Sequence, residues 1–510
     1  MAERLDVVIE PGLARRAGFA MVWGQAGKVL EIVLTTAIAV IAVRALKPQG
    51  FGLYSLLTNL AGTASVLIPV VSVESLGAVL PRFANARARL YLFAAVALVR
   101  LVVIVVVATV MVSLWGVVRT DLGLAPVPVK VLVAAAGYWI AQDLSASVAA
   151  YYQASLDFRR VTLWRTAGNI VTLAGLSAVV VLDLVSVGST LIVVSAGYLT
   201  GLAGLAAGLR ATGRPQRPDR DELRFVFGFT RNVWLIGVAT LAVSTQMYVV
   251  LIGAITQDST EVAFYVAAVA VVGRAQILLL TGWASVIVPT FGAVHHRDGV
   301  VGLARAWRLF SRLWLLVTAP LNVLLLVLAT PLVDLLFGDA YEPAAKLLAI
   351  VAAFGLAGAF LAGPPSVGAL WALDRQNVLV RIRLLTTPFA FALAAVLIWR
   401  YEAVGAVVAI GSATIATSAA ELIVARRAIR FVYPVPFALW AAAASVVVAL
   451  PALLIHPHGG VQLALSASLG IGAGIAAAAV IRPFGPDDVD ALRSVSPRLA
   501  ASALRRFARA

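Results

Sequence analysis

Runs of twenty or more mainly apolar residues recur along this chain from residue 19 to residue 481. A helix needs about 20 such residues to cross the hydrocarbon core of a bilayer. Apolar residues make up 62% of the 510 residues and charged residues only 13%, whereas soluble domains carry about 25% charged residues. The sequence therefore excludes a water-soluble fold, and because it contains no cysteine it also excludes a disulfide-stapled one.

The apolar runs divide into fourteen predicted spans with short connections between them. They cover residues 19–43, 52–80, 90–118, 129–151, 161–182, 187–209, 225–256, 262–291, 309–337, 344–372, 380–399, 404–425, 436–455 and 461–481. We therefore expect an all-α polytopic membrane protein with about 14 transmembrane helices. The first run is too long for the apolar region of a signal peptide, about 7–15 residues, so a retained first span is favoured over a cleaved leader.

The basic residues gather on one side of the membrane when these spans alternate in direction. With the N-terminus in the cytoplasm, 31 of the 40 lysines and arginines fall in inside segments and six in outside loops. This asymmetry is what the positive-inside rule describes. Both termini are therefore predicted to be cytoplasmic, and the net charge of +16 indicates orientation rather than a nucleic-acid partner.

Three pairs of similar segments suggest an internal repeat of six spans. Tyr54 corresponds to Tyr265, Pro81 to Pro289 and Asp157 to Asp374, at offsets of 211, 208 and 217 residues. An even number of spans gives both halves the same orientation. The sequence thus predicts two parallel six-helix bundles around a central cavity, although membrane loops of similar composition would also produce such matches.

The repeat sets the predicted domain organisation. It comprises an N-terminal six-helix bundle (1–209), a C-terminal six-helix bundle (210–430), an additional helix pair (431–482) and a basic cytoplasmic tail (483–510). The tail mixes apolar residues with five arginines, which is typical of a helix that lies on anionic lipids. A solvated tail is the alternative.

Five segments in order along about 420 residues resemble those of the polysaccharide flippases, the O-antigen and exopolysaccharide transporters of the multidrug/oligosaccharidyl-lipid/polysaccharide (MOP) exporter superfamily. They are residues 47–55, 73–83, 152–160, 336–341 and 401–406. Residues 47–55, for example, resemble the pattern L-G-P-x-x-[FY]-G-x-Y that follows the first span. Lys47-Pro48 and Tyr401-Glu402 replace the usual Gly-Pro and Tyr-Gly, which leaves the subfamily open.

The resemblance implies transport of an undecaprenyl-pyrophosphate-linked glycan from the inner to the outer leaflet of the bacterial plasma membrane. It further implies alternating access driven by a proton or sodium gradient or by the membrane potential, without a bound cofactor. Glycosyltransferases and a polysaccharide polymerase are the implied partners in cell-surface polysaccharide biosynthesis. A multidrug exporter of the same superfamily is the alternative.

Three basic residues that belong neither to the inside segments nor to the outside loops lie within the predicted spans, where ionisable groups are costly and mark functional sites. They are Lys28, Arg100 and Arg274. Arginine can hold phosphate oxygens in a bidentate manner, so we expect these cations to bind the pyrophosphate, with Arg274 first. Alternatives are a neutral Lys28–Glu31 pair, an Arg100 that extends to the headgroups, and an ion pair of Arg274 with Asp143 or Glu74.

Seven further polar residues within the spans are expected to line the cavity or to couple transport to an ion. They are Glu31, Glu74, Asp143, Gln142, Gln246, Gln276 and Asn322. No catalytic or metal-binding arrangement accompanies them, because the four histidines lack a second ligand at zinc spacing. The predicted outer loops are also too short for a membrane glycosyltransferase, so we expect a transporter rather than an enzyme.

Overall fold

The computed structural model describes residues 11–68, 80, 86–117, 127–155, 157–209, 226, 230–231, 234–235, 237–238, 240–241, 244–280 and 283–485. These residues form fourteen α-helices and one 3-10 helix, with no β-strand among the elements described. The chain divides into two compact units, residues 1–241 and residues 242–510.

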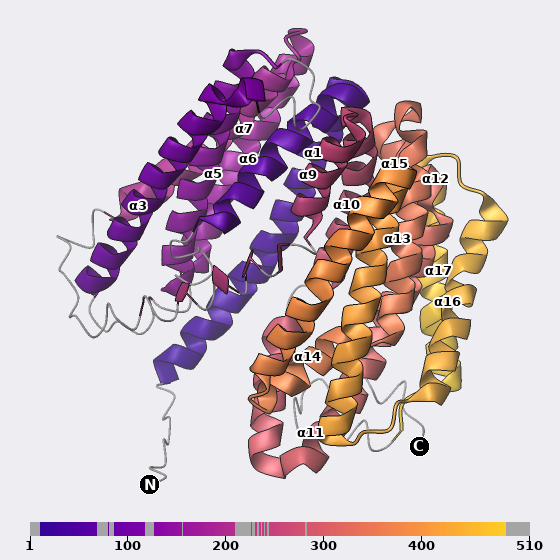
Figure 1. The fold of residues 1–510 in the computed structure, drawn as a ribbon. Coiled ribbons are helices and arrows are strands. Elements are labelled where there is room, and N and C mark those ends of the chain that lie inside the picture. The colour runs from indigo at the N-terminus through magenta and orange to yellow at the C-terminus, as the bar shows by residue number, and fades with distance from the viewer. Residues whose placement is uncertain are drawn as a thin grey trace. The chain divides into compact units, whose positions relative to one another are not determined.

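The first unit is a bundle of long apolar helices (Figure 1). Its elements are α1 (Pro11–Leu67), α3 (Ala86–Ser113), α5 (Val129–Ala154), α6 (Phe158–Val181) and α7 (Val187–Leu209). Helix α1 contains a break at Lys47, whose φ of 57° and ψ of 170° are not helical. Pro48 follows the break, and a proline at the first position of a new helical segment loses no hydrogen bond. Helix α1 therefore holds the first predicted span and residues 52–67 of the second.

Small residues allow α6 and α7 to pack closely. A Cβ atom on Gly197 of α7 would lie 1.9 Å from Thr172 Oγ1 and 2.6 Å from the Gly168 carbonyl oxygen of α6. Membrane helices use such glycines because van der Waals contact replaces the hydrophobic effect between them.

Gly197→Ala is expected to lower the free energy of unfolding by about 1–3 kcal/mol, the usual cost of overpacking. The control is Gly137→Ala in α5, since a Cβ there meets nothing within 4 Å. Thermal unfolding of both variants in the same detergent measures the difference. Equal stability of the two variants would contradict the close α6–α7 contact.

The second unit contains the remaining elements (Figure 1). They are α9 (Thr245–Thr256), α10 (Ser259–Leu280), α11 (Trp283–Val327), α12 (Ala329–Phe337), the 3-10 helix η3 (Asp339–Tyr341), α13 (Glu342–Phe360), α14 (Gly363–Ala372), α15 (Gln376–Ile429), α16 (Val435–Ile455) and α17 (Gly460–Ile481).

Single residues with positive φ interrupt two of these helices, α11 and α15, and another such residue separates α13 from α14. They are Gly299 in α11 (φ 65°), Glu402 in α15 (φ 54°) and Ala362 between α13 and α14 (φ 47°). At the second break, the Glu261 side chain of α10 accepts a hydrogen bond from Ala403 N at 3.2 Å. It thereby satisfies one of the unpaired N–H groups at the start of a helical segment.

Eleven helices of the described residues are long and apolar enough to cross a membrane. Because α1 and α15 each combine two predicted spans, these eleven helices cover thirteen of the fourteen predictions. The other, 225–256, is described mainly by α9. The prediction of an all-α polytopic membrane protein is thus confirmed, whereas the parallel relation of the two halves stays a prediction.

The connection predicted at 292–308 differs from the structure. Helix α11 runs through these residues, and only Gly299 interrupts its helical geometry. Glycine adopts positive φ at little cost, so one residue can change the chain direction where the polar composition indicated a longer loop.

Candidate functional site

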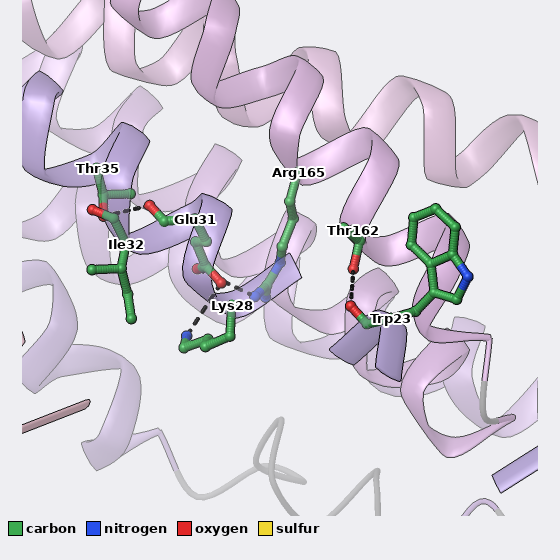
Figure 2. A network of polar contacts seen from close by, with 7 residues as sticks. All are labelled: Trp23, Lys28, Glu31, Ile32, Thr35, Thr162 and Arg165. Carbon is green, nitrogen blue, oxygen red and sulfur yellow. Dashed lines mark hydrogen bonds and ion pairs between the residues drawn. The ribbon is translucent and has the colours of Figure 1, made fainter. Parts of the chain in front are cut away.

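A carboxylate between two cations joins α1 to α6 in the first unit, as Figure 2 shows. Glu31 Oε2 lies 3.2 Å from Lys28 Nζ, and Glu31 Oε1 lies 3.7 Å from Arg165 NH1. The three side chains are between 28% and 38% exposed. We call Lys28, Glu31 and Arg165 the α1–α6 cation cluster.

Local packing brings Arg165 to this position. Gly27 faces Thr162, whose Oγ1 would lie 2.3 Å from a Cβ on Gly27, so the missing side chain lets α6 approach α1. Thr162 Oγ1 also donates a hydrogen bond to the Trp23 carbonyl oxygen at 3.4 Å. Arg165 follows Thr162 by three residues and hence lies on the same face of α6.

The cation cluster has a net charge of +1, since one carboxylate faces two cations. Glu31 can orient Lys28 and Arg165 without cancelling both charges. Half-exposed cations held in this way suit an anion such as a phosphate group, with guanidinium offering two parallel donors.

Arg165 is not among the cations that the sequence predicted for the site, because it was counted with the basic residues of the inside segments. The available signal was its position inside the predicted span 161–182. The predicted pairing of Lys28 with Glu31 is present in the structure, but Arg165 adds a positive charge that a neutral pair would lack.

A second polar network is buried between α1, α3 and α5. Arg100 donates to both carboxylate oxygens of Asp143, from Nε to Oδ2 at 3.0 Å and from NH2 to Oδ1. Trp139 Nε1 donates to Ser65 Oγ at 2.6 Å, and Ser65 Oγ lies 3.5 Å from Asp143 Oδ1.

Burial determines the role that this network supports. Arg100 is 2% exposed and Asp143 is 5% exposed, so the Arg100 side chain does not extend to a solvated position. Burying an ion pair costs desolvation energy. Removing only one partner is strongly destabilising, because it leaves the other charge buried and unpaired. The network is therefore a structural link in the conformation observed, and substrate contact by Arg100 stays a prediction.

Arg274 lies half-buried in α10 of the second unit. Within the described part of the chain, no hydrogen bond or ion pair joins its side chain to another residue. Of the two predicted acidic partners, Asp143 is bound by Arg100, and Glu74 lies outside the described residues. Pairing of Arg274 with Glu74 therefore stays a prediction, as does binding of an anion by its guanidinium.

The four predicted polar residues without charge lie in different surroundings. Gln142 in α5 and Gln246 in α9 are half-buried. Gln276 and Asn322 line a cavity of about 410 Å³ inside the second unit, between α9, α10, α11, α13, α14 and α15. The described residues contain no group of three histidine or acidic side chains that could hold a metal ion.

A family model described as "Polysaccharide biosynthesis protein" matches residues 40–346. No curated protein matches the sequence significantly.

Several solved structures share this fold at low sequence identity. The lipid II flippase MurJ in an inward closed conformation is 12% identical with a TM-score of 0.60, and the match covers 92% of this chain and 98% of MurJ. An inward-facing multidrug resistance MATE transporter of the MOP superfamily is 12% identical with a TM-score of 0.58, covering 80% and 94%. A MOP superfamily transporter from Pyrococcus furiosus Vc1 is 14% identical with a TM-score of 0.52, covering 81% and 95%.

Proposed function

Because this chain belongs to the family of polysaccharide biosynthesis proteins, we propose that it is a flippase for a lipid-linked glycan. Its substrate is an undecaprenyl-pyrophosphate-linked oligosaccharide, which it moves from the inner to the outer leaflet. The shared fold with a lipid II flippase and with MATE transporters supports a transport function.

The observation that carries this proposal is the α1–α6 cation cluster in a multi-pass membrane protein. A pyrophosphate is the one strongly charged part of a lipid-linked glycan, and it needs cations on its route through the apolar core. Lys28 and Arg165 supply them while Glu31 holds their geometry. Arg274 supplies a further cation in the second unit.

Alternating access would expose these cations to each side of the membrane in turn. A proton or sodium gradient or the membrane potential drives the cycle, and Glu31 is a candidate for the coupling carboxylate. The positive-inside distribution supports cytoplasmic termini, and the proposed undecaprenyl-linked substrate implies the bacterial plasma membrane. There the basic tail would meet anionic lipids, and glycosyltransferases and a polymerase would supply and consume the glycan.

Reconstitution tests the proposal directly. Proteoliposomes containing a fluorescent undecaprenyl-pyrophosphate oligosaccharide should show protein-dependent movement of the label between leaflets, measured by quenching with a membrane-impermeant reductant. Gradients of protons, of sodium and of charge are imposed in turn. The proposal would be overturned if the protein did not accelerate movement of the label, relative to protein-free liposomes, under any of these gradients.

A multidrug exporter is the second candidate, because MATE transporters share the fold with a TM-score of 0.58. The same proteoliposomes distinguish it, since export of ethidium or tetraphenylphosphonium without glycan movement would favour this candidate.

Arg274→Ala is expected to raise the KM for the lipid-linked glycan about tenfold, since a lost charge-assisted hydrogen bond is worth about 1.5–3 kcal/mol. Arg297→Ala is the control, because Arg297 is exposed and paired with the adjacent Asp298. Initial flipping rates against glycan concentration measure both variants. An unchanged KM in Arg274→Ala would remove Arg274 from the substrate path.

A further inference from the structure

The cavity inside the second unit combines aromatic rings with neutral polar groups. Its aromatic lining includes Tyr265, Trp314 and Phe354. Its polar lining includes Gln276, Asn322, Thr414 and Ser418, and none of the described residues that line it carries a charge. Its volume of about 410 Å³ falls in the range of small-molecule sites, about 300–1,000 Å³.

Asn322 indicates that this cavity is a binding site rather than a packing defect. The Asn322 side chain is 1% exposed. Its Nδ2 donates to the Thr318 carbonyl oxygen at 2.8 Å, but its Oδ1 accepts no hydrogen bond from the described residues. A buried acceptor left unpaired destabilises the fold, so a ligand that donates to Oδ1 would recover this loss.

The neighbouring helix keeps space for the Asn322 amide. Gly355 of α13 faces it, and a Cβ on Gly355 would lie 2.2 Å from Asn322 Oδ1. A larger residue at this position would push the amide aside. Asn322 and Gly355 both line the cavity, and the missing side chain of Gly355 leaves room for the Asn322 amide there.

The chemistry of the lining selects the class of ligand. Phosphate groups need positive charge to offset their desolvation, and the described part of the lining offers none. A sugar ring has hydroxyl groups that donate to an amide oxygen and accept from amide or hydroxyl hydrogens, and its C–H face packs on aromatic rings. We propose that this cavity binds a neutral saccharide residue, with Asn322 Oδ1 accepting from a sugar hydroxyl.

The saccharide chemistry follows from the lining alone, whereas its assignment to the glycan part of a lipid-linked substrate rests on the proposed function. Under that assignment the cavity would recognise a sugar of the oligosaccharide. The charged part of the substrate would be bound by other residues.

Binding of free glycosides to the full-length protein in lipid nanodiscs tests the inference. The probes are the methyl glycosides of glucose, galactose and N-acetylglucosamine, and saturation-transfer NMR with competition measures binding. At least one glycoside should bind, and Asn322→Leu should weaken it at least about tenfold, as expected for a lost hydrogen bond of about 1.4 kcal/mol. Gln153→Leu in α5 of the first unit is the control and should bind as the unaltered protein does, because Gln153 is half-buried and far from the cavity lining in the sequence.

Asn322→Leu is close in shape and removes an unpaired acceptor, so its unfolding temperature should not fall. If it does fall, Ser418→Ala replaces it as the test variant. The inference is overturned if no glycoside binds, if both cavity variants bind as tightly as the unaltered protein, or if sodium or tetraphenylphosphonium occupies the cavity instead.

The flipping assay separates the two proposals. Movement of the lipid-linked glycan without glycoside binding in the cavity overturns the inference and leaves the proposed function intact. Glycoside binding that Asn322→Leu abolishes, in a protein that flips no lipid-linked glycan, supports the saccharide site and overturns the proposed function.

Discussion

Asp143→Ala is expected to lower the free energy of unfolding by about 3–5 kcal/mol, because it removes the carboxylate that neutralises a buried guanidinium. Both Arg100–Asp143 hydrogen bonds would be lost at a site where the two residues are 2% and 5% exposed. The variant should give little folded protein or a much lower unfolding temperature, measured by thermal scanning in detergent.

Two companion variants show whether burial of the charge is the cause. The double variant Arg100→Met with Asp143→Leu should recover most of the stability, since apolar residues of similar size often replace a buried pair without loss. Asp298→Ala should leave the stability nearly unchanged, because Asp298 pairs with the adjacent Arg297 at 2.7 Å and both side chains are at least 42% exposed. A double variant as unstable as Asp143→Ala would show that the charge imbalance is not the cause.

The sequence was sufficient to predict the membrane-spanning helices, because span length and apolar composition are local properties. Thirteen of fourteen predicted spans correspond to helices long enough to cross a membrane. The breaks at Lys47 and Glu402 fall within the resembling segments 47–55 and 401–406. The left-handed geometry at these two residues depends on the surrounding packing, as the hydrogen bond from Ala403 N to Glu261 illustrates.

The partners of the site residues could not be predicted in the same way. Lys28 and Glu31 are three residues apart, so their contact follows from helical periodicity. Arg165 is 134 residues away from Glu31 in the sequence, and only the close α1–α6 approach at Gly27 brings the two together. Asn322 was recognisable as a polar residue in an apolar run, but its unpaired oxygen depends on Gly355 in a different helix.

The largest functional effect is expected at the α1–α6 cation cluster. Lys28→Ala and Arg165→Ala should each reduce the flipping rate of the lipid-linked glycan about 10- to 100-fold, because each loses a charge-assisted contact of about 1.5–3 kcal/mol to the pyrophosphate. The double variant should be inactive in the proteoliposome assay. Its folding should be intact, since these side chains are 38% and 35% exposed and the ion pairs with Glu31 contribute little at such exposure.

Charge-retaining and matched variants distinguish substrate binding from a link between α1 and α6. Lys28→Arg keeps the positive charge and should keep most of the flipping rate. Arg159, like Arg165, belongs to α6, but it is exposed and lies over the Trp23 ring at 5.7 Å. The flipping rate of Arg159→Ala should therefore be unchanged. Glu31→Gln removes the carboxylate that both cations share but leaves both positive charges, so a structural link predicts a loss equal to that of Arg165→Ala. An anion site instead predicts that Glu31→Gln retains glycan binding while Arg165→Ala loses it. Equal losses of glycan binding in the two variants would refute the anion site, whereas a loss of flipping alone in Glu31→Gln fits its role as a coupling carboxylate.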